Sequence, residues 1–278
     1  MDLSIKEQIN FFTKFKDWYR EIIQNFKFDE QKDYEARDYL SKILKLKGDS
    51  WNLENILHSF KDQIQSKLKI LIYGCGPSLE ETIEGIIKDI GYDAFKNCVN
   101  LAADGAAVLL NERGIPIHAI FTDLDGITNN EFSSSKFMII HAHGNNIENL
   151  KEFKKNILNF NNIIGTTQVE PLENLVNPGG FTDGDRILYF LRTFLLPHHK
   201  LFLIGMDFNN IIGKYSKPEM KENQKGTPTK LKKLKYAVKL LDWLSNEIKN
   251  DIIFINSESP LKKKYSITLK EFEKIIID

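Results

Sequence analysis

The hydrophobic residues of this chain follow one spacing in its first 66 residues and another spacing thereafter. In the first part, apolar side chains recur at steps of three and four residues, which is typical of amphipathic helices. We predict helices over residues 11–26 and 33–46, the second ended by Gly48, and a third helix that begins after Ser50. The aromatic stripe of the first helix is interpreted as packing against the next domain rather than as the lining of a ligand pocket. Residues 1–66 are therefore predicted to be a helical region with a scaffolding or docking role.

From residue 67 onward, short apolar runs alternate with helical segments, and we predict an α/β catalytic domain over residues 67–278. This alternation indicates a mostly parallel sheet with helices on both faces, a Rossmann-like arrangement. The predicted strands are residues 70–73, 99–102, 119–121, 137–140, 163–164, 201–204 and 252–255. Ligands of such sheets bind beyond the carboxyl ends of the strands, so the residues after each strand carry the functional information.

Composition adds few constraints, because 42% hydrophobic and 27% charged residues are ordinary values for a globular protein. Lysine plus arginine and aspartate plus glutamate number 38 each, so no excess charge indicates nucleic acid or a membrane surface as a partner. The 2 cysteines are too few for a disulfide framework, and no apolar run approaches the length of a membrane span. We expect a soluble cytoplasmic protein, and the sequence leaves open whether it is a homo-oligomer.

An acidic turn follows the predicted strand at 119–121, where residues 121–126 read Phe-Thr-Asp-Leu-Asp-Gly. Side chains two residues apart in an extended segment point the same way, so Asp123 and Asp125 can present carboxylates on one side. Gly126 lets the chain turn away without a Cβ clash. Two oxygen ligands facing open space suit Mg²⁺, which leaves its other positions to water and phosphate. Taken alone, the same residues fit a polar turn equally well.

A glycine-rich turn, Gly-Cys-Gly-Pro-Ser-Leu, follows the first predicted strand at residues 74–79. Such glycines let the backbone approach a ligand closely, and free N–H groups at a helix start favour phosphate. Ser78 fits an N-cap, and Glu81 would complete a capping box. The turn has neither the Walker A nor the dinucleotide pattern, so a purely structural role is nearly as well supported. Cys75 is interpreted as a small buried residue, since no base accompanies it to make a catalytic thiol.

Further polar residues follow the second and fourth predicted strands. Asp104 would reach the same edge of the sheet as the acidic turn, or would cap the next helix. The fourth strand ends in His-Ala-His-Gly-Asn-Asn at residues 141–146. A His-x-His pair can bind zinc, but no third cysteine or histidine ligand is evident nearby, so we favour contacts with a polar ligand. Asn145 or Asn146 is alternatively a helix cap.

A second acidic loop, Asn-Pro-Gly-Gly-Phe-Thr-Asp-Gly-Asp-Arg, occupies residues 177–186 and opens a predicted helix. Asp183 fits a stabilising acid at a helix N-terminus. Asp183 and Asp185 would repel each other, however, unless a cation or a donor compensates them. Arg186 is placed in the sequence to be that donor, or to clamp a phosphate.

Residues 209–229 lack a regular pattern and are rich in lysine, as is the helix start at residues 230–235. A loop of this length is usually functional or disordered. We interpret it, with Lys230, Lys232 and Lys233, as a mobile lid over anionic phosphates, and the alternative is a solvated lysine-rich surface. Lysines at a helix start oppose the helix dipole, which favours an anionic partner.

In their order along the chain, these motifs resemble those of the archaeal 6-hydroxymethyl-7,8-dihydropterin diphosphokinase family. The matching stretches are YGCGPSLE at 73–80, AADGA at 102–106, TDLDG at 122–126, HAHGNN at 141–146, GGFTDGDR at 179–186 and GMDF at 205–208. Each motif alone is unspecific, but the ordered set is specific. The resemblance implies a Mg²⁺-dependent enzyme that uses ATP and serves tetrahydromethanopterin or folate synthesis. It also implies a catalytic core similar to that of thiamine pyrophosphokinase, in which acids at strand ends hold magnesium.

By this resemblance, diphosphate passes from ATP to the hydroxymethyl oxygen of a reduced pterin and AMP is released, with Asp125 as the candidate that orients the hydroxyl. The candidate catalytic residues are Asp123, Asp125, Asp183, Asp185 and Arg186. The candidate metal ligands are Asp104, Asp123, Asp125 and Asp185. The candidates for binding ATP are Gly74, Gly76, Pro77, Ser78, Asp104, Gly105, His143, Asn145, Lys230 and Lys233.

Two other classes of protein stay open. The Gly-Pro-Ser-Leu turn and the later Gly-x-Asp motif also resemble sialyltransferase-like glycosyltransferases that modify flagellin. Such a protein would bind a nucleotide-sugar and would not need both acidic loops. A non-enzymatic nucleotide-binding module would bind ATP without producing AMP.

Overall fold

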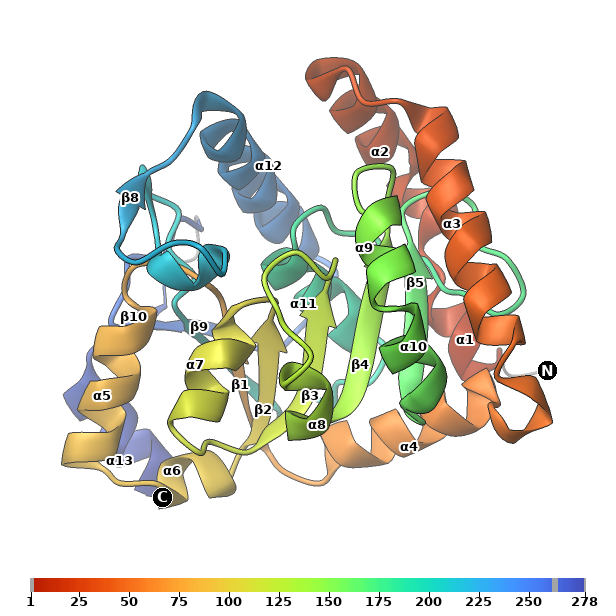
Figure 1. The fold of residues 1–278 in the computed structure, drawn as a ribbon. Helices are drawn as coiled ribbons and strands as arrows, with labels where there is room; N and C mark the ends of the chain where they lie inside the picture. Colours follow the sequence, from red (N-terminus) through yellow and green to blue (C-terminus); the bar gives the residue numbers. More distant parts are fainter. Residues whose placement is uncertain (1–2, 262–264, 278) are drawn as a thin grey trace.

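The computed structural model describes residues 3–261 and 265–277 and shows a parallel sheet between two layers of helices (Figure 1). The strands lie in the order β10-β9-β6-β1-β2-β3-β4-β5, and every neighbouring pair is parallel. Their bounds are β1 (Lys69–Tyr73), β2 (Val99–Ala103), β3 (Ile117–Thr122), β4 (Ser135–Ala142), β5 (Ile163–Thr167), β6 (Lys200–Ile204), β9 (Ile252–Ile255) and β10 (Ser266–Ile267). A separate antiparallel pair consists of β7 (Ile211–Ile212) and β8 (Gln224–Lys225).

The strands expected from the apolar runs are all present, and the predicted α/β class is confirmed. Along β1 the side chains alternate between two cores, with Ile70 and Ile72 on one side of the sheet and Leu71 and Tyr73 on the other. Because both faces are covered, the strands consist almost wholly of buried apolar residues, which made the runs visible in the sequence. The strands β7, β8 and β10 were not predicted, since a two-residue strand has no period to detect.

Helices cover both faces of the sheet. One face carries α1 (Ile5–Ile9), α2 (Phe12–Phe26), α4 (Leu53–Gln65), α11 (Asp183–Leu191) and α12 (Pro228–Leu244). The other face carries α3 (Glu30–Lys45), α5 (Leu79–Asp89), α6 (Asp93–Lys96), α7 (Ala106–Glu112), α8 (Glu131–Ser134), α9 (Ile147–Glu152), α10 (Lys154–Asn159) and α13 (Leu269–Ile277). Two short 3-10 helices are η1 (Gly48–Ser50) and η2 (Lys214–Ser216). Among the described residues, no helix combines the length and the apolar character needed to cross a membrane.

The N-terminal helices pack directly on the sheet. Phe15 and Tyr19 of α2 are buried in the same core as the strands, which confirms that the aromatic stripe is largely core. The helix predicted over residues 11–26 starts one residue later, behind the separate helix α1, because the Phe11 N–H donates to the carbonyl of Asn177 (2.7 Å). The next helix, α3, begins before its predicted start, because Asp29 caps it. The helices before residue 66 share a core with the strands after it, so the structure marks no boundary there. The division of the chain into two regions at residue 66 therefore stays a prediction.

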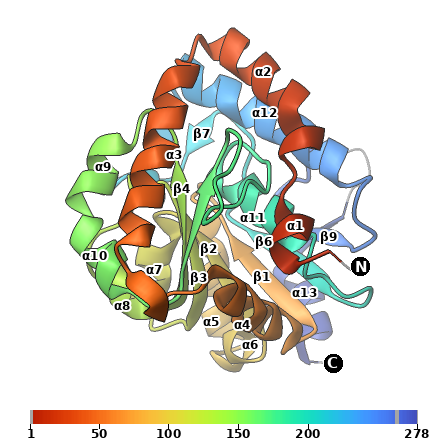
Figure 2. The ribbon, with the colours of Figure 1, turned by 90° about the vertical axis from the view of Figure 1, so that its right-hand side faces the viewer.

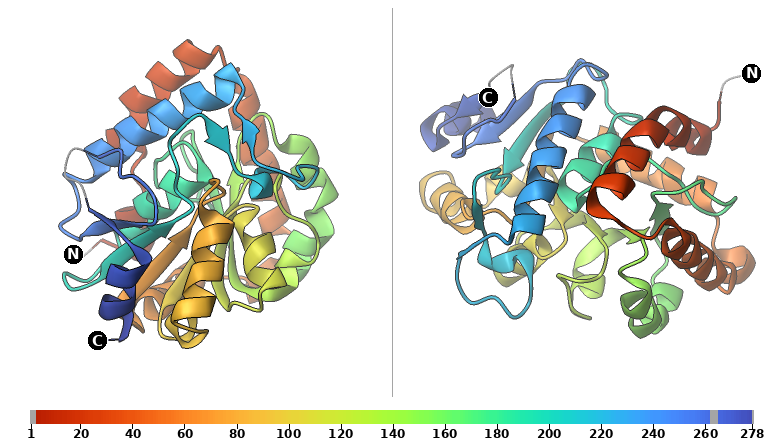
Figure 3. Two further views of the ribbon diagram at one scale, coloured as in Figure 1. Left: turned by 90° about the vertical axis from the view of Figure 1, so that its left-hand side faces the viewer. Right: turned by 90° about the horizontal axis from the view of Figure 1, so that it is seen from above.

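The order of the strands reverses beside β1, because β2 to β5 extend the sheet in one direction and β6, β9 and β10 extend it in the other. Open α/β sheets bind ligands at such a switch point, beyond the carboxyl ends of the strands. These ends point to the top of Figure 1, where α12 and the pair α2–α3 rise above the sheet. Figures 2 and 3 show α12 beside α2, and the hydroxyl of Tyr236 joins the two helices by donating to Glu21 (2.8 Å).

Replacing Phe60 by alanine should lower the free energy of unfolding by about 3–5 kcal/mol, because deleting a buried aromatic ring leaves a cavity. Phe60 is fully buried, and its ring lies against those of Phe121, Phe137, Phe190 and Phe194. Urea denaturation followed by circular dichroism measures the change.

The matched control for this variant is Leu68→Ala, because Leu68 is 57% exposed. An exposed side chain contributes little, so the control should change stability by less than about 0.5 kcal/mol. If Phe60→Ala lowered the free energy of unfolding no more than the control does, Phe60 of α4 could not be packed against the sheet.

Candidate active site

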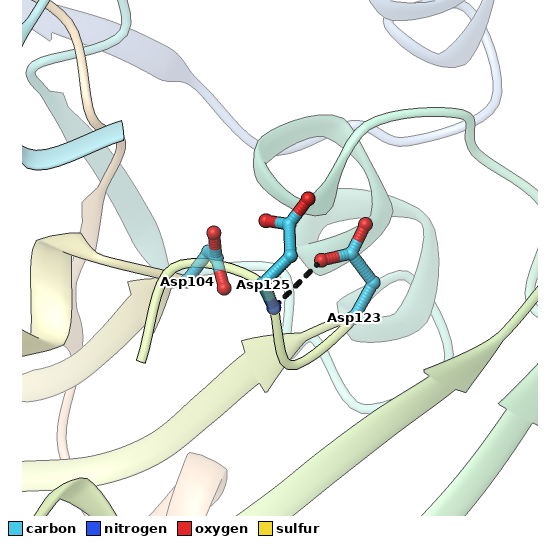
Figure 4. A group of neighbouring side chains, drawn as sticks. All are labelled: Asp104, Asp123 and Asp125. Atoms are coloured by element: carbon cyan, nitrogen blue, oxygen red, sulfur yellow. Dashed lines mark hydrogen bonds between the residues drawn. The ribbon is translucent and has the colours of Figure 1, made fainter. Parts of the chain in front are cut away.

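Three carboxylates gather at the ends of β2 and β3 (Figure 4). These strands are neighbours, with Ala103 opposite Phe121, so the residues that follow them emerge side by side. Asp104, Asp123 and Asp125 can each offer an oxygen within 4.8 Å of the others. The Asp125 N–H also donates to Asp123 Oδ1 at 3.3 Å, the dashed line in Figure 4. Within the described ranges, this trio is the one set of three or more acids, histidines or cysteines that lie close enough to share a metal ion.

The position of Asp104 is fixed by its backbone and by two donors. Its φ of +49° is left-handed, and its Oδ1 accepts hydrogen bonds from the hydroxyl of Thr122 (2.7 Å) and the N–H of Gly126 (3.2 Å). A Cβ at position 126 would lie 2.0 Å from Asp104 Oδ2, so only glycine fits there. The alternative that Asp104 caps α7 is wrong, since the N-cap is Gly105 and no side chain caps that helix.

The His-x-His motif contributes one histidine to the acids. His143 Nε2 lies 3.0 Å from Asp123 Oδ2, whereas His141 is buried with its Nδ1 2.9 Å from the hydroxyl of Thr166. The arrangement therefore supports polar contacts rather than a zinc site. Asn146 is the N-cap residue of α9 but makes no side-chain cap bond, because its Oδ1 accepts from the N–H of His143 (3.0 Å) instead. Its amide nitrogen donates to the carbonyls of Asp123 (2.9 Å) and His141 (2.6 Å).

The second acidic loop brings Asp183 and Arg186 to the cleft, but not Asp185. The Arg186 guanidinium donates to Asp183 (3.0 Å) and to the carbonyl of Phe181 (3.1 Å), so it is the donor that compensates Asp183. Asp185 is fully buried, and its Oδ1 accepts from the N–H groups of Phe181 (2.7 Å) and Thr182 (2.9 Å) in a capping box. The assignment of Asp185 as a metal ligand is therefore not supported, because backbone donors at the start of α11 occupy it.

The cluster holds more negative charge than its surroundings compensate. Burial and the carboxylate of Asp123 raise the pKa of Asp104 well above its ordinary value. The same two causes raise the pKa of Asp183 to about 7, although Arg186 opposes them. Burial also acts to raise the pKa of Asp123, but the hydrogen bond and charge of His143 bring it below its ordinary value. Clustered carboxylates of this kind are stabilised by a cation, and oxygen ligands of this type suit Mg²⁺.

The glycine turn after β1 lies at the cleft, but the N–H groups of its two glycines and of Ser78 already have partners within the protein. Those of Gly74 and Gly76 donate to backbone carbonyls of Ile204 and Gly205, at 2.9 and 2.7 Å. Ser78 donates its N–H (3.0 Å) and its hydroxyl (2.7 Å) to Asp207 Oδ2. The turn therefore ties β1 to the segment after β6, and a phosphate cradle made of these N–H groups is not supported.

The capping box predicted in this turn is also absent. Ser78 is the N-cap of α5 but makes no side-chain cap hydrogen bond, so the pairing expected with Glu81 does not form. The reason is that the hydroxyl of Ser78 is directed to Asp207, to which it donates a hydrogen bond. Cys75 has a pKa raised by burial, in agreement with an inert thiol.

The lysine-rich segment after β6 folds over the same edge of the sheet, and part of it is ordered as β7, η2 and β8 rather than as an irregular loop (Figure 3). Burial lowers the pKa of Lys217, but an ion pair with Asp125 raises it above its ordinary value. Lys230 and Lys233 line the cleft. Lys232 instead turns away and donates to a backbone carbonyl of α2 at 2.5 Å. Two of the three lysines predicted at the helix start therefore face the acids.

The acids open into a cleft of about 1390 Å³, including the space open to solvent. A second cavity of about 710 Å³, again including the space open to solvent, adjoins it and shares some of its lining residues. The predicted ATP-binding residues that line one or both cavities are Gly74, Gly76, Asp104, His143, Asn145, Lys230 and Lys233. Those not in the lining are Pro77, Ser78 and Gly105. At Gly105 a Cβ would lie 1.9 Å from the carbonyl oxygen of Tyr215, so this glycine allows η2 to pack closely.

Comparison with known proteins connects this geometry to a family. A family model described as "6-hydroxymethylpterin diphosphokinase MptE-like" matches residues 43–213. The chain belongs to this MptE-like family. Curated relatives named 6-hydroxymethyl-7,8-dihydropterin pyrophosphokinase include one from Pyrococcus furiosus, 34% identical over 86% of this chain and 96% of the relative. Another is from Methanocaldococcus jannaschii, 35% identical over 86% of this chain and 98% of the relative. The resemblance drawn from the motifs is thus confirmed.

One solved structure that resembles this chain is the Maf glycosyltransferase from Magnetospirillum magneticum AMB-1. The TM-score is 0.40 and the identity 13%, over 76% of this chain and 37% of that chain. A likeness at this level carries no argument about the site or its chemistry.

Two parts of the cleft in this MptE-like protein were not found from the sequence. One is the turn between α2 and α3 with the start of α3, residues 27–33, which precedes the stretch matched by the family model. Its Asp33 is buried and accepts hydrogen bonds from the Gly144 N–H and the Gln168 amide, both at 2.7 Å. The other part is Gln168, which directly follows β5 and belongs to none of the motifs named above. A usable signal was the acidic residue at a core-facing position of α3, because an acid is rarely buried without partners.

Proposed function

We propose that this protein transfers diphosphate from ATP to 6-hydroxymethyl-7,8-dihydropterin with Mg²⁺, in tetrahydromethanopterin or folate biosynthesis. Membership of the MptE-like family and the names of the curated relatives support the acceptor and the reaction class. The observation that carries the chemistry is the trio Asp104, Asp123 and Asp125 at the carboxyl edge of the sheet, in a cleft that is also lined by lysines. Such a set suits a metal–polyphosphate site.

The residues present fit a magnesium ion. The three carboxylates are hard oxygen donors, and charge on Asp104 is disfavoured unless a cation offsets its acidic neighbours. Asp104, Asp123 and Asp125 would hold the ion. Bound there, Mg²⁺ would supply charge neutralisation for the phosphate oxygens of ATP. Asp185 is not part of this set, since its Oδ1 is bonded to the backbone at the start of α11.

In the proposed reaction, the hydroxymethyl oxygen of the pterin forms a bond to the β-phosphorus of ATP. The bond from that phosphorus to the oxygen bridging the α-phosphate breaks, and AMP leaves with the electron pair. Asp125 orients the attacking hydroxyl and accepts its proton, which can pass to solvent because the Asp125 side chain is 39% exposed. Transfer of this type depends mainly on positioning and on charge stabilisation.

The cationic side chains of the cleft are suited to hold the polyphosphate. Lys230 and Lys233 come from the first turns of α12, and Arg186 lies across the cleft at the start of α11. Charge-assisted hydrogen bonds from such groups to phosphate are stronger than neutral ones. Lys217 pairs with Asp125, so the segment between β6 and α12 lies over the acids.

The double variant Lys230→Ala with Lys233→Ala should raise the KM for ATP by about tenfold or more, because each lysine can form a charged hydrogen bond to phosphate. Lys232→Ala is the matched control. It removes a lysine from the same helix start, but one that binds α2 instead of facing the cleft.

Steady-state kinetics and melting temperatures of both proteins make the comparison. The control should keep its KM for ATP within about twofold. The double variant should melt within a few degrees of the parent, since neither half-buried lysine forms an ion pair with another described residue. An unchanged KM for ATP in the double variant would leave only a solvated lysine surface.

The experiment that tests the proposed function identifies the nucleotide product. Purified protein is incubated with ATP, Mg²⁺ and 6-hydroxymethyl-7,8-dihydropterin, and each component is omitted in turn. AMP should accumulate in the complete mixture alone. Formation of ADP would contradict diphosphate transfer, and release of a nucleoside monophosphate only from a nucleotide-sugar would identify a glycosyltransferase instead. Binding of ATP without any AMP would identify a nucleotide-binding module.

A further inference from the structure

The two cavities of the cleft differ in chemistry and meet at the acids. The shared lining includes Asp104, Asp183, Lys230 and Lys233, the residues proposed to hold metal and phosphate. Away from this junction the smaller cavity is largely apolar, lined by Met206, Phe208, Ile211, Ile212 and Leu234. Away from the junction on the other side, the larger cavity is lined by polar groups and two aromatic rings. A reaction between two substrates needs two such compartments on either side of the transferred group.

We infer that the purine of ATP occupies the smaller, apolar cavity and that the bicyclic acceptor occupies the larger cavity, against the wall made by the α2–α3 turn. This inference rests on the proposed function. It assigns a role to the N-terminal region, because residues 27–33 form this wall and lie before the stretch matched by the family model. The N-terminal helices thus supply acceptor recognition as well as scaffolding.

The apolar cavity suits a flat purine whose phosphates point toward the acids. It lies at the switch point between β1 and β6, where Gly74 and Gly205 leave their strands. Its far wall is the β7–β8 segment, which packs so closely that a Cβ at Gly213 would lie 2.4 Å from the carbonyl of Cys75. Ligand pockets are mostly apolar with a few polar groups that set orientation, and here Lys230 and Lys233 stand at the inner end.

The larger cavity suits a planar heterocycle that is rich in hydrogen-bonding groups. Phe28 and Phe181 both line it, and Lys233 Nζ lies 5.7 Å from the centre of each ring. Both rings are half-buried, and an aromatic ring at the wall of a polar cleft provides a stacking surface for a planar ligand. On another wall, the amide of Gln168 is held by Asp33 (2.7 Å), which also accepts from the hydroxyl of Tyr19 (2.8 Å). This amide is therefore positioned before a ligand binds, as specific recognition requires.

The reacting group decides which substrate lies on which side. Asp123, Asp125 and His143 line the larger cavity and are not part of the lining of the smaller one. A hydroxyl oriented by Asp125 must therefore approach from the larger cavity. With the acceptor there, the phosphates of ATP reach the junction from the opposite side, which is the arrangement that an in-line displacement needs.

The test separates the two KM values in variants of the two cavities. Phe28→Ala should raise the KM for the pterin by about tenfold, because a stacking face is lost, and should leave the KM for ATP within about twofold. Leu234→Trp fills the apolar cavity, so it should raise the KM for ATP and leave the KM for the pterin nearly unchanged. Phe28→Trp keeps an aromatic face and should restore the pterin KM, which a merely structural role of Phe28 would not predict. Gln168→Leu, a second acceptor-side variant, should also raise the pterin KM alone.

Binding of the acceptor, followed by its fluorescence, and binding of ATP in the absence of acceptor provide readouts independent of turnover. Equal changes in both KM values for the folded Phe28→Ala and Gln168→Leu proteins would overturn the assignment, as would an effect on ATP alone. If either Phe28→Ala or Gln168→Leu fails to fold, the other of these two variants decides the test. If the parent protein forms no AMP, the proposed function fails first and the assignment falls with it, so the two failures are distinguishable.

Discussion

Replacing Asp123 or Asp125 by asparagine should lower AMP formation by about two orders of magnitude or more, while the protein still folds. The carboxamide keeps the shape of the side chain but removes a negative charge from the proposed metal site. A bound metal supplies several kcal/mol of transition-state stabilisation, and each 1.4 kcal/mol is about a factor of ten in rate. Both residues line the cleft beside Asp104 and would hold the metal, so the loss should appear in kcat and not only in KM.

The two variants should differ in stability. Asp123 Oδ2 lies 3.0 Å from His143 Nε2, so Asp123→Asn should cost about 1.5–3 kcal/mol, the range for a hydrogen bond to a charged group. Asp125 is 39% exposed and pairs with Lys217, so Asp125→Asn should be nearly neutral. Circular dichroism melting curves and AMP formation are measured on the same preparations.

Asp185→Asn is the matched control, because it changes an acid of the second acidic loop that takes part in the capping box of α11 instead of facing the cleft. An asparagine oxygen can still accept from the backbone donors, so turnover should stay within a few-fold of the parent. Near-normal turnover in Asp123→Asn and Asp125→Asn at saturating Mg²⁺ would show that residues 121–126 form only a structural turn.

Removal of divalent metal should abolish AMP formation, and Mg²⁺ should restore it. The physical reason is that three acids crowd one edge of the sheet and the charged phosphates of ATP must approach them. Dialysis against a chelator followed by titration with Mg²⁺ measures the dependence. Activity that survives chelation would contradict a metal site.

The metal should also stabilise the protein, because it binds the folded chain and not the unfolded one. At a concentration 100 times its dissociation constant the gain is about 2.7 kcal/mol. A rise in melting temperature with Mg²⁺ should therefore appear in the parent and in Asp185→Asn and be lost in Asp125→Asn. The same rise in all three proteins would place the metal elsewhere.

The parts of this fold that followed from the sequence are those set by local pattern. A strand buried on both faces must be a run of apolar residues, and the acids directly after β2 and β3 therefore had to emerge at one edge. Asp104, Asp123 and Asp125 could be grouped on this basis alone. The class of the fold and the position of the site at the carboxyl ends follow from the same argument.

The assignments that failed depend on contacts between distant segments. Asp183 and Asp185 look alike in the sequence, but the phase of α11 turns one to the cleft and the other to backbone donors. The sequence suggested that the glycine turn could bind phosphate. In the structure the N–H of Ser78 donates instead to Asp207, which is 129 residues away in the chain. Gln168 and Asp33 are 135 residues apart, and neither had a local pattern that linked them.

The most direct test of diphosphate transfer at this site follows the β-phosphate of ATP. ATP labelled in its β-phosphate is incubated with Mg²⁺, 6-hydroxymethyl-7,8-dihydropterin and the parent protein, and the products are separated. The label should appear in the pterin product, attached directly to the hydroxymethyl oxygen, while the AMP formed in equal amount should be unlabelled. Label in ADP, or a pterin product that carries only the γ-phosphate, would contradict diphosphate transfer.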